Sequence, residues 1–254
     1  MNYEKSKLIF ILTAAIILTI IAVIFINRHY QSIIVDVPVF NHITPSVVSQ
    51  FNSTSSPNSS IQLPNSLLLK VPFTPQAPTA NWDASHNEDC EEASAVMANA
   101  YYNGPRDIKL DPTYVEGQLT KLTDWEMQTF GYNLDISSEE TNKMIETNYH
   151  LQTKILYGFT EQDIKKQLSQ NHLVLLPANG QLLGNPNYKQ PGPKYHMLVI
   201  RGFTPSAIIT NDPGTKNGLN YSYSFDTLYN ANGDWSHQTN SVDLSKKNVI
   251  VVWK

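Results

Sequence analysis

The stretch that decides the fold runs from Glu88 to Pro105, EDCEEASAVMANAYYNGP, and contains Cys90, the one cysteine in a chain of 254 residues. From Ala93 onward, small and apolar residues recur at helical intervals until Asn-Gly-Pro ends the pattern. Asp89 and Glu92 have the N-cap and N3 spacing of a capping box. The sequence therefore predicts a helix that begins at Cys90.

The residues around this helix predict an α+β domain over residues 67–254. Helical patterns fill its N-terminal half, and short apolar or alternating strand patterns fill its C-terminal half. Capping signals open two of the helices, at Ser137 or Ser138 and at the Thr160/Asp163 pair. We expect further helices over 112–122, 138–148 and 160–170, and strands over 67–71, 151–157, 173–177, 195–203, 207–211, 221–225 and 249–253.

The first 66 residues differ in composition from this domain. Residues 8–26, LIFILTAAIILTIIAVIFI, carry no charge, Pro or Gly and are long enough for a helix to cross the ~30 Å hydrocarbon core. A cleaved signal peptide is the alternative, but its apolar stretch is normally about 7 to 15 residues and ends at a small-x-small site. Asn-Arg-His-Tyr follows here instead. We predict a short tail and a single signal anchor within residues 1–30, and a flexible stalk rich in Ser, Asn and Pro over 31–66.

The distribution of charged residues indicates on which side of a membrane the domain lies and which partners it does not bind. Lys5 and Lys7 precede the apolar segment and Arg28 follows it, which favours a cytoplasmic N-terminus. We therefore predict a single-pass protein of the cell membrane with its domain outside the cytoplasm. After residue 30 there are 15 Lys and Arg against 21 Asp and Glu, which argues against nucleic acid or an anionic lipid surface as a partner. One cysteine excludes an internal disulfide, so the stability of the domain must come from its core.

Cys90 is the first candidate for chemistry. A cysteine in the first turn of a helix lies where free backbone N–H groups and the helix dipole stabilise its thiolate, the reactive form. The neighbouring carboxylates oppose that ionisation, so a cation has to offset them if the thiol is to be activated. These carboxylates belong to Glu88, Asp89, Glu91 and Glu92.

A histidine in a predicted hairpin can supply that cation. His196 lies in the apolar strand pattern YHMLVIRGF, and a turn at Thr204-Pro205 leads into a second strand pattern. A turn centred there makes paired positions sum to about 409, so His196 faces Asp212 or Pro213 across the ladder. Asp212 would orient the imidazole as the third member of a catalytic triad does. A single Cys with His and Asp far downstream is a known nucleophile pattern.

These residues resemble the cysteine peptidases that process bacteriocins by cutting double-glycine leaders, peptidase family 39 of the papain-like superfamily. The resemblance covers about residues 71–253 and rests on the order Gln, Cys, His, Asp in VPFTPQ, CEEASAVMANAYY, HMLVIRGF and NDPGT. It implies a papain-like fold in which the helix of Cys90 packs on an antiparallel sheet. By the same resemblance Cys90 is the nucleophile, His196 the base and Asp212 its orienting partner, while Gln76 supplies an oxyanion donor beside a backbone N–H at Cys90.

The sequence departs from that family in two ways. Glu91 follows the cysteine where Gly is common, and no ATP-binding cassette or multi-span transporter domain accompanies the peptidase-like part. We therefore expect the chemistry, and not the leader-peptide substrate, to transfer. Trp82 and Glu91 are candidate substrate-binding residues, and residues 181–194, QLLGNPNYKQPGPK, form either a lid or an ordinary surface insertion.

The predicted function is a membrane-anchored, extracytoplasmic cysteine peptidase or amidase that acts on a peptide, a protein or a cell-wall peptide through an acyl-enzyme. A transpeptidase would use the same thioester, and an inactive binding or scaffolding domain would keep the fold without the chemistry; the acidic residues around Cys90 favour the latter. A metal site over residues 86–91 is a third alternative, although its spacing matches no standard zinc pattern. The sequence has no nucleotide loop, dinucleotide fingerprint or haem motif, and we expect no cofactor or metal.

Overall fold

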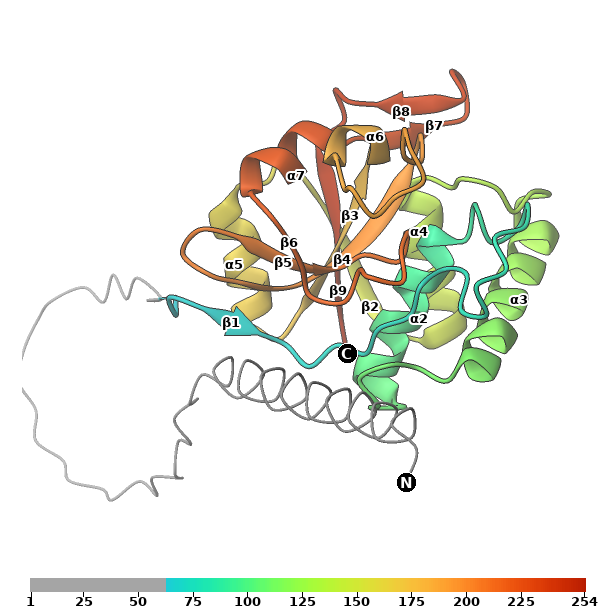
Figure 1. Cartoon of the computed structure of the whole chain (residues 1–254), viewed down its shortest axis with the longest axis horizontal. Helices are drawn as coiled ribbons and strands as arrows, with labels where there is room; N and C mark the ends of the chain where they lie inside the picture. Colours follow the sequence, from blue (N-terminus) through green and yellow to red (C-terminus); the bar gives the residue numbers. More distant parts are fainter. Residues whose placement is uncertain (1–62) are drawn as a thin grey trace, which may run out of the picture. The chain divides into compact units, whose positions relative to one another are not determined.

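The computed structural model describes residues 63–254. The predicted tail and anchor, residues 1–30, and all but the end of the predicted stalk, residues 31–66, lie outside the described residues. Within residues 63–254, no helix combines the length and apolar character needed to cross a bilayer. The described part is an α+β domain with an antiparallel sheet, as predicted (Figure 1).

A central antiparallel sheet organises the domain. Six strands lie in the order β2-β9-β3-β4-β5-β6, and β1 pairs with β4 beside this path. A separate hairpin consists of β7 and β8. The strands are β1 (Leu67–Leu68), β2 (Gln152–Tyr157), β3 (Leu173–Ala178), β4 (His196–Phe203), β5 (Ile208–Asn211), β6 (Tyr221–Tyr223), β7 (Asp234–Ser236), β8 (Ser241–Asp243) and β9 (Asn248–Trp253).

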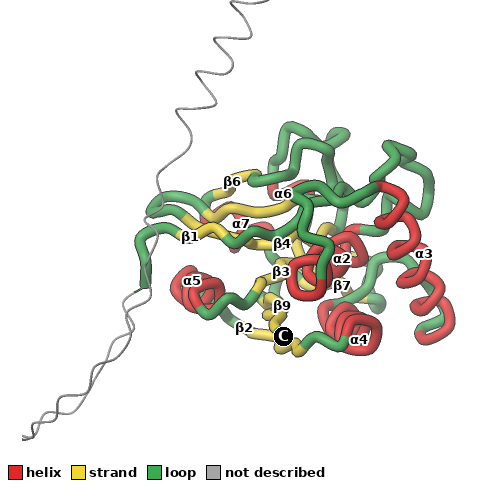
Figure 2. Tube along the Cα trace, turned by 90° about the horizontal axis from the view of Figure 1, so that it is seen from below, coloured by secondary structure: helices red, strands yellow, loops and turns green. Residues whose placement is uncertain are grey.

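Helices pack on both faces of this sheet, and α5 lies on the opposite side of β3 and β9 from α2 and α4 (Figure 2). Met197 and Val199 of β4 belong to the apolar core under α2, α3 and α4, whereas Leu198 and Ile200 belong to the core under α5 and α7. Strand side chains alternate between faces, so burial on both sides explains why residues 197–200 of β4 are continuously apolar. The helices are α2 (Cys90–Asn103), α3 (Pro112–Thr129), α4 (Ser138–Tyr149), α5 (Glu161–Ser169), α6 (Gly180–Leu183) and α7 (Phe225–Ala231).

The helix that carries the cysteine begins at Cys90, as predicted, but the predicted capping box does not form there. Asp89 makes no side-chain cap hydrogen bond, and the side chains of Asp89 and Glu92 are both buried. The predicted capping box at this helix is therefore wrong. The boxes at Ser137 and Thr160, which open α4 and α5, are present.

Other predicted boundaries differ for identifiable reasons. Helix α3 ends at Thr129, beyond the predicted residue 122, because its buried stripe continues through Glu126, a residue type that hides the pattern. Helix α7 begins at Phe225, where a strand was predicted to end, since Ser224 caps it by accepting from the Thr227 N–H. Helix α6 and the β7–β8 hairpin are too short for a periodic signal.

Strand β1 is attached to β4 by more than its two paired residues. The backbone N–H of Leu69 donates to the carbonyl oxygen of Arg201 over 2.8 Å. The buried Arg201 guanidinium donates back to the Leu69 carbonyl from Nε at 2.9 Å and from Nη2 at 2.6 Å, and its Nη1 reaches Asn211 Oδ1 at 3.3 Å. The start of the domain is thus held directly on the strand pair that carries the candidate site.

Candidate active site

The hairpin of β4 and β5 brings His196 and Asp212 together. The ladder pairs Val199 with Asn211, and a bulge follows, so the register is one to two positions from the predicted one. His196 Nε2 lies 2.8 Å from Asp212 Oδ1, and both side chains are buried. Because the carboxylate occupies Nε2, Nδ1 is the ring nitrogen left for a second partner.

Three more donors fix the other oxygen of Asp212. Its Oδ2 accepts from the hydroxyls of Tyr188 and Tyr223, each at 2.7 Å, and from Asn185 Nδ2 at 3.0 Å. Burial alone raises the pKa of Asp212, but His196 and the two hydroxyls outweigh burial and hold that pKa below its ordinary value. Asp212 is therefore a carboxylate at neutral pH.

The segment 181–194, predicted as a lid or an ordinary insertion, supplies two of these donors. Asn185 and Tyr188 are buried, and the Tyr188 ring packs edge-on against His196 with 5.4 Å between the centroids. This part of the segment is built into the site and is not an ordinary surface insertion. Its role was missed because no local sequence pattern connects residues 185 and 188 to position 212.

Gly214 leaves the space that the imidazole occupies. Its backbone N–H donates to Asp212 Oδ1 at 3.1 Å. A Cβ at this position would lie 2.9 Å from His196 Cε1 and 2.9 Å from Tyr188 Cε1. Both distances are shorter than a carbon–carbon contact tolerates, so a side chain here would displace the ring.

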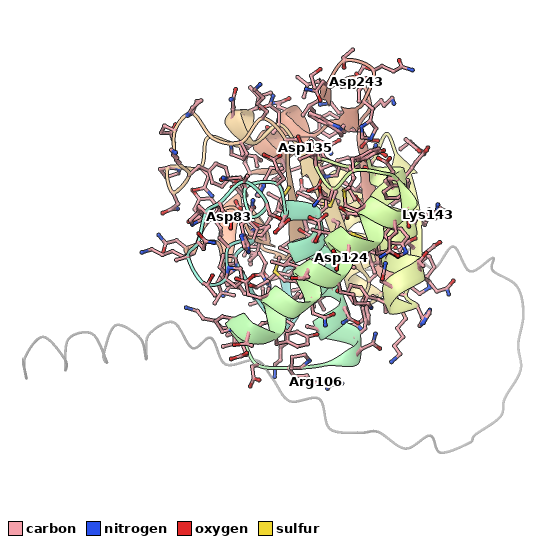
Figure 3. All side chains as sticks on the ribbon, turned by 90° about the vertical axis from the view of Figure 1, so that its right-hand side faces the viewer. Asp83, Arg106, Asp124, Asp135, Lys143 and Asp243 are labelled. Carbon is pink, nitrogen blue, oxygen red and sulfur yellow. The ribbon has the colours of Figure 1, made fainter. Side chains whose placement is uncertain are left out.

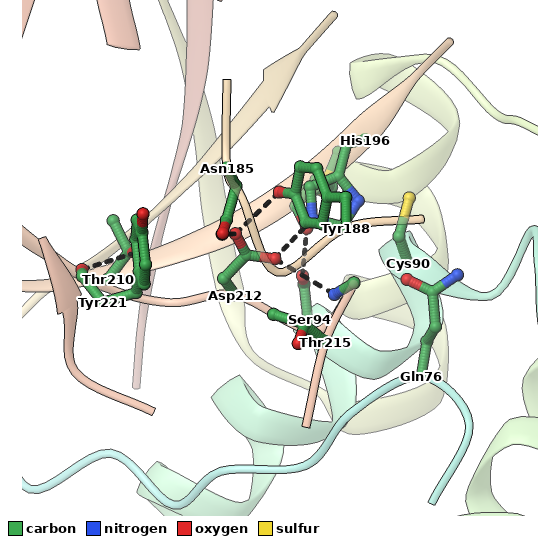
Figure 4. A network of polar contacts seen from close by, with 12 residues as sticks. Gln76, Cys90, Ser94, Asn185, Tyr188, His196, Thr210, Asp212, Thr215 and Tyr221 are labelled. Carbon is green, nitrogen blue, oxygen red and sulfur yellow. Dashed lines mark hydrogen bonds and ion pairs between the residues drawn. The ribbon is translucent and has the colours of Figure 1, made fainter. Parts of the chain in front are cut away.

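Cys90 opens α2 beside the beginning of β4. One turn further along the helix, Ser94 Oγ donates to the Met197 carbonyl over 3.3 Å, which joins the two elements at this end. The Cys90 side chain points toward the His196 ring (Figure 4). Its thiol donates to Glu91 Oε2 over 2.9 Å, and only 2% of the residue is exposed.

Carboxyl groups dominate the electrostatics at the sulfur. Burial, reinforced by the acidic groups of Glu91 and Asp135, raises the pKa of the Cys90 thiol well above its ordinary value. Burial, and then Asp135, also raises the pKa of Glu91 far above that of a free glutamic acid. Asp135 lies in the segment between α3 and α4 (Figure 3). The site thus favours the protonated forms of both groups.

A second buried carboxyl pair joins α2 to α3. Burial raises the pKa of Glu126 to about 7 and that of Glu92 well above its ordinary value. Both oxygens of Glu126 and Oε2 of Glu92 are buried without a hydrogen-bond partner of regular geometry. Burial also raises the pKa of Asp89 to about 7. The sequence predicts charged carboxylates at the start of α2, whereas the structure buries these acids as groups that resist ionisation.

The predicted oxyanion donor Gln76 holds the chain that leads into Cys90. Its Nε2 donates to the carbonyls of His86 and Asn87 at 2.8 and 3.0 Å, while its Oε1 is buried without a partner. Its backbone N–H donates to the Pro213 carbonyl at 2.9 Å. Gln76 therefore joins the loop before Cys90 to the loop after Asp212, and both amide N–H groups are already engaged.

The two predicted substrate-binding residues lie in different surroundings. Trp82 is 44% exposed, in the loop before α2. Glu91 is 0% exposed, and its Oε1 accepts from the Ile136 N–H at 2.9 Å. Within the described residues, no three His, Cys, Asp or Glu side chains are placed to hold a metal ion. His86, the histidine of the alternative metal site, lies instead between the carboxylates of Asp83 and Glu116.

Comparisons with known proteins place the chain in a family. Residues 68–242 match the model of the Peptidase C39 like family. No curated protein matches the chain. A solved structure from Bacillus anthracis, described as a C39-like peptidase, is 15% identical, with a TM-score of 0.48 over 74% of this chain and 98% of that one. On the extent of the family match, which covers more than half of its length, this chain belongs to the Peptidase C39 like family.

Proposed function

We propose that the domain is a papain-like cysteine peptidase or amidase in which Cys90 is the nucleophile, His196 the base and Asp212 the group that orients the base. The observation that carries this proposal is the buried pair of His196 and Asp212, 2.8 Å apart, with the Cys90 side chain pointing toward the same imidazole. Membership of a C39-like peptidase family supports the same reaction class.

In the proposed reaction, His196 Nδ1 accepts the thiol proton while the sulfur attacks the acyl carbon. The tetrahedral intermediate collapses, and the leaving amine takes the proton from Nδ1, which leaves a thioester on Cys90. A water molecule then attacks the thioester and gives its proton to Nδ1. Release of the acid and return of the proton to the sulfur restore the enzyme. Asp212 stabilises the imidazolium in both halves, which is consistent with its lowered pKa.

The oxyanion in this scheme forms beside the start of α2. The backbone N–H of Cys90 is one proposed donor and the Gln76 amide is the second. Gln76 can serve only if its side chain turns, because its N–H groups now reach the carbonyls of His86 and Asn87. The unpartnered Oε1 supports such a turn, since a buried acceptor without a donor is unfavourable where it lies.

The proposed location and substrate rest on the sequence. An anchor over residues 8–26 and a stalk over 31–66 would hold the domain outside the cytoplasm, near peptides, proteins or cell-wall peptides. Trp82, exposed in the loop before α2, is the proposed apolar contact for such a substrate. The double-glycine leader cut by bacteriocin-processing relatives is a narrower substrate for which the site provides no specific support.

One observation favours a second candidate, an inactive binding domain with a peptidase fold. Burial raises the pKa of Cys90, and an ionised Glu91 would raise it further, which opposes thiolate formation at neutral pH. In that case His196 and Asp212 would be a structural pair. A transpeptidase would differ from the hydrolase only in accepting an amine in place of water.

Alkylation of the sulfur tests the proposal directly, because Cys90 is the only thiol in the chain. We expect iodoacetamide to label the full-length protein well below pH 8, and His196→Ala to shift labelling to the alkaline range of an isolated thiol, near or above about 8.5. His150→Asn is the matched control, since His150 is an exposed histidine in a left-handed conformation that Asn tolerates. Alkaline labelling in both the wild type and His196→Ala would overturn the peptidase and favour the binding domain.

A further inference from the structure

Glu91 contacts the proposed nucleophile more closely than any other hydrogen-bonding side chain in the described structure. Its Oε2 lies 2.9 Å from Cys90 Sγ, and its Oε1 accepts the Ile136 N–H at 2.9 Å. The side chain is 0% exposed. Both carboxyl oxygens therefore contact a protein group, and the side chain is shielded from bulk solvent.

The groups around Glu91 do not favour a carboxylate. Asp135 faces it from the segment before α4, and Tyr195 faces it from the residue before β4. On its own helix the neighbours are acidic too, with Glu92 next in sequence and Asp89 at the N-cap. Across residues 63–254, no Lys, Arg or His lies within ion-pair distance of Glu91. Lys194 lowers the pKa of Asp135, but burial and Glu88 outweigh it. An isolated buried carboxylate is costly, so the carboxyl keeps its proton at neutral pH.

The hydrogen bonds then determine which oxygen carries that proton. Oε1 accepts an N–H from Ile136, so the hydroxyl of a neutral Glu91 is on Oε2. The neighbour of Oε2 is Cys90 Sγ. A hydroxyl that donates to sulfur stabilises the thiolate, whereas a carboxylate at the same place would hold the thiol.

We propose that Glu91, as a neutral carboxylic acid, is a further catalytic residue that donates Oε2–H to the Cys90 sulfur and stabilises its thiolate. The inference rests on the proposed peptidase function. In the resting state the thiol donates to Oε2. When the thiol proton passes to His196 Nδ1, the sulfur becomes the acceptor and Oε2–H turns to donate to it, while Glu91 keeps its own proton. The Oε2–H bond to sulfur weakens when the sulfur bonds to the acyl carbon and strengthens again when the thioester is cleaved and the thiolate leaves. No other reactant is needed.

Two substitutions separate this role from the alternatives. Glu91→Gln keeps an acceptor for Ile136 and a neutral N–H donor for the sulfur, so we expect its alkylation rate at pH 7 to stay within about threefold of wild type. Glu91→Met keeps the side-chain volume but has no hydrogen-bond donor. We expect its alkylation rate at pH 7 to decrease by about tenfold to a hundredfold, which is the effect of losing a hydrogen bond to a charged group. Glu92→Gln is the matched control, because Glu92 is a buried carboxyl on the same helix that does not contact the sulfur. We expect this variant to change the alkylation rate at pH 7 by less than about threefold.

The outcomes discriminate clearly. A rate for Glu91→Gln more than about tenfold above wild type would show that Glu91 is a carboxylate that suppresses the thiolate, and a wild-type rate in Glu91→Met would show that it has no role. Should Glu91→Met fail to fold, the infrared difference between wild type and Glu91→Gln at pH 7 decides: a protonated Glu91 contributes a carboxylic-acid C=O band, and its absence overturns the inference. His196→Ala tests the proposed peptidase function itself. Alkylation that does not depend on His196 would overturn that function, whereas the Glu91 variants test only the role of Glu91.

Discussion

Asp212→Asn replaces one oxygen of a carboxylate that accepts five hydrogen bonds with an amide NH₂ of the same shape. Three donors reach Oδ2, from Tyr188, Tyr223 and Asn185, while His196 Nε2 and a backbone N–H reach Oδ1. The amide loses least if its oxygen keeps the three donors and its NH₂ faces His196. The backbone N–H is then unpaired, and Nε2 must accept a proton instead of donating one.

The magnitudes follow from that rearrangement. One unpaired buried N–H costs about 1 to 3 kcal/mol, and the three remaining hydrogen bonds lose their charge assistance, about 1 kcal/mol each. We expect Asp212→Asn to lower the free energy of unfolding at pH 7 by roughly 4 to 6 kcal/mol. The forced tautomer places a proton on Nδ1, where the Cys90 proton should be received, so the acylation rate should fall by about 10⁴-fold.

The lowered pKa of Asp212 determines how this stability difference depends on pH. A carboxyl whose folded pKa is lowered stabilises the fold above its unfolded pKa of about 3.9, and this contribution is lost as pH falls through the lower, folded value. The stability difference between wild type and Asp212→Asn should therefore be complete from pH 7 to about pH 4 and decrease below that range.

Urea unfolding of the full-length chain at pH 7 and pH 3, with Cys90 alkylation measured in parallel, checks these numbers. Asp124→Asn is the matched control, because Asp124 is an exposed carboxyl on α3 (Figure 3). A change below about 1 kcal/mol in Asp212→Asn, with alkylation as in wild type, would refute the assigned role of the carboxylate.

Three further outcomes are expected. Glu126→Gln should stabilise the protein by roughly 1 to 3 kcal/mol at pH 8 and by little at pH 4.5. The reason is that the pKa of Glu126 is raised to about 7, so the stability of the wild type falls as pH rises from about 4.3 toward 7. Urea unfolding across this pH range checks the prediction, and an equal effect at both pH values would contradict it. Arg201→Lys removes the paired hydrogen bonds from Nε and Nη2 to the Leu69 carbonyl and should lower the free energy of unfolding by about 2 kcal/mol. Unchanged protection of the Leu69 amide in hydrogen exchange would show that these hydrogen bonds do not hold β1 in place. Gly214→Ala should displace the imidazole and reduce alkylation at pH 7 by at least about tenfold with a smaller effect on stability, and wild-type labelling would show that the ring accommodates the methyl group.

The parts of the fold that the sequence predicts are those written in short, local patterns. The helix start at Cys90 follows from the end of an irregular loop and the beginning of helical spacing, and the α5 cap follows from Thr160 and Asp163. The β4–β5 hairpin is equally local, and its turn places Asp212 near His196 despite an error of one to two positions in register.

The parts that the sequence does not predict depend on contacts between distant segments. Tyr188 and Tyr223 lie 24 and 11 positions from Asp212, and neither spacing has a meaning in a helix or a strand. Burial is similarly non-local. Glu92 has the N3 position of a capping box, but the packing of α3 against α2 places it against Glu126 and removes it from the helix end.

The connection of β1 to β4 also determines how the domain responds to a pull on its N-terminal side. Traction applied before residue 67 reaches a two-residue strand first, so the force is borne by the few hydrogen bonds between Leu69 and Arg201 and is not shared across the sheet. Arg201 also holds Asn211, which is covalently joined to Asp212. A mechanical load strong enough to detach β1 should therefore disturb a support of the carboxylate proposed to orient His196 before the core unfolds. We expect such a load to reduce the proposed activity at a lower force than the force that denatures the protein.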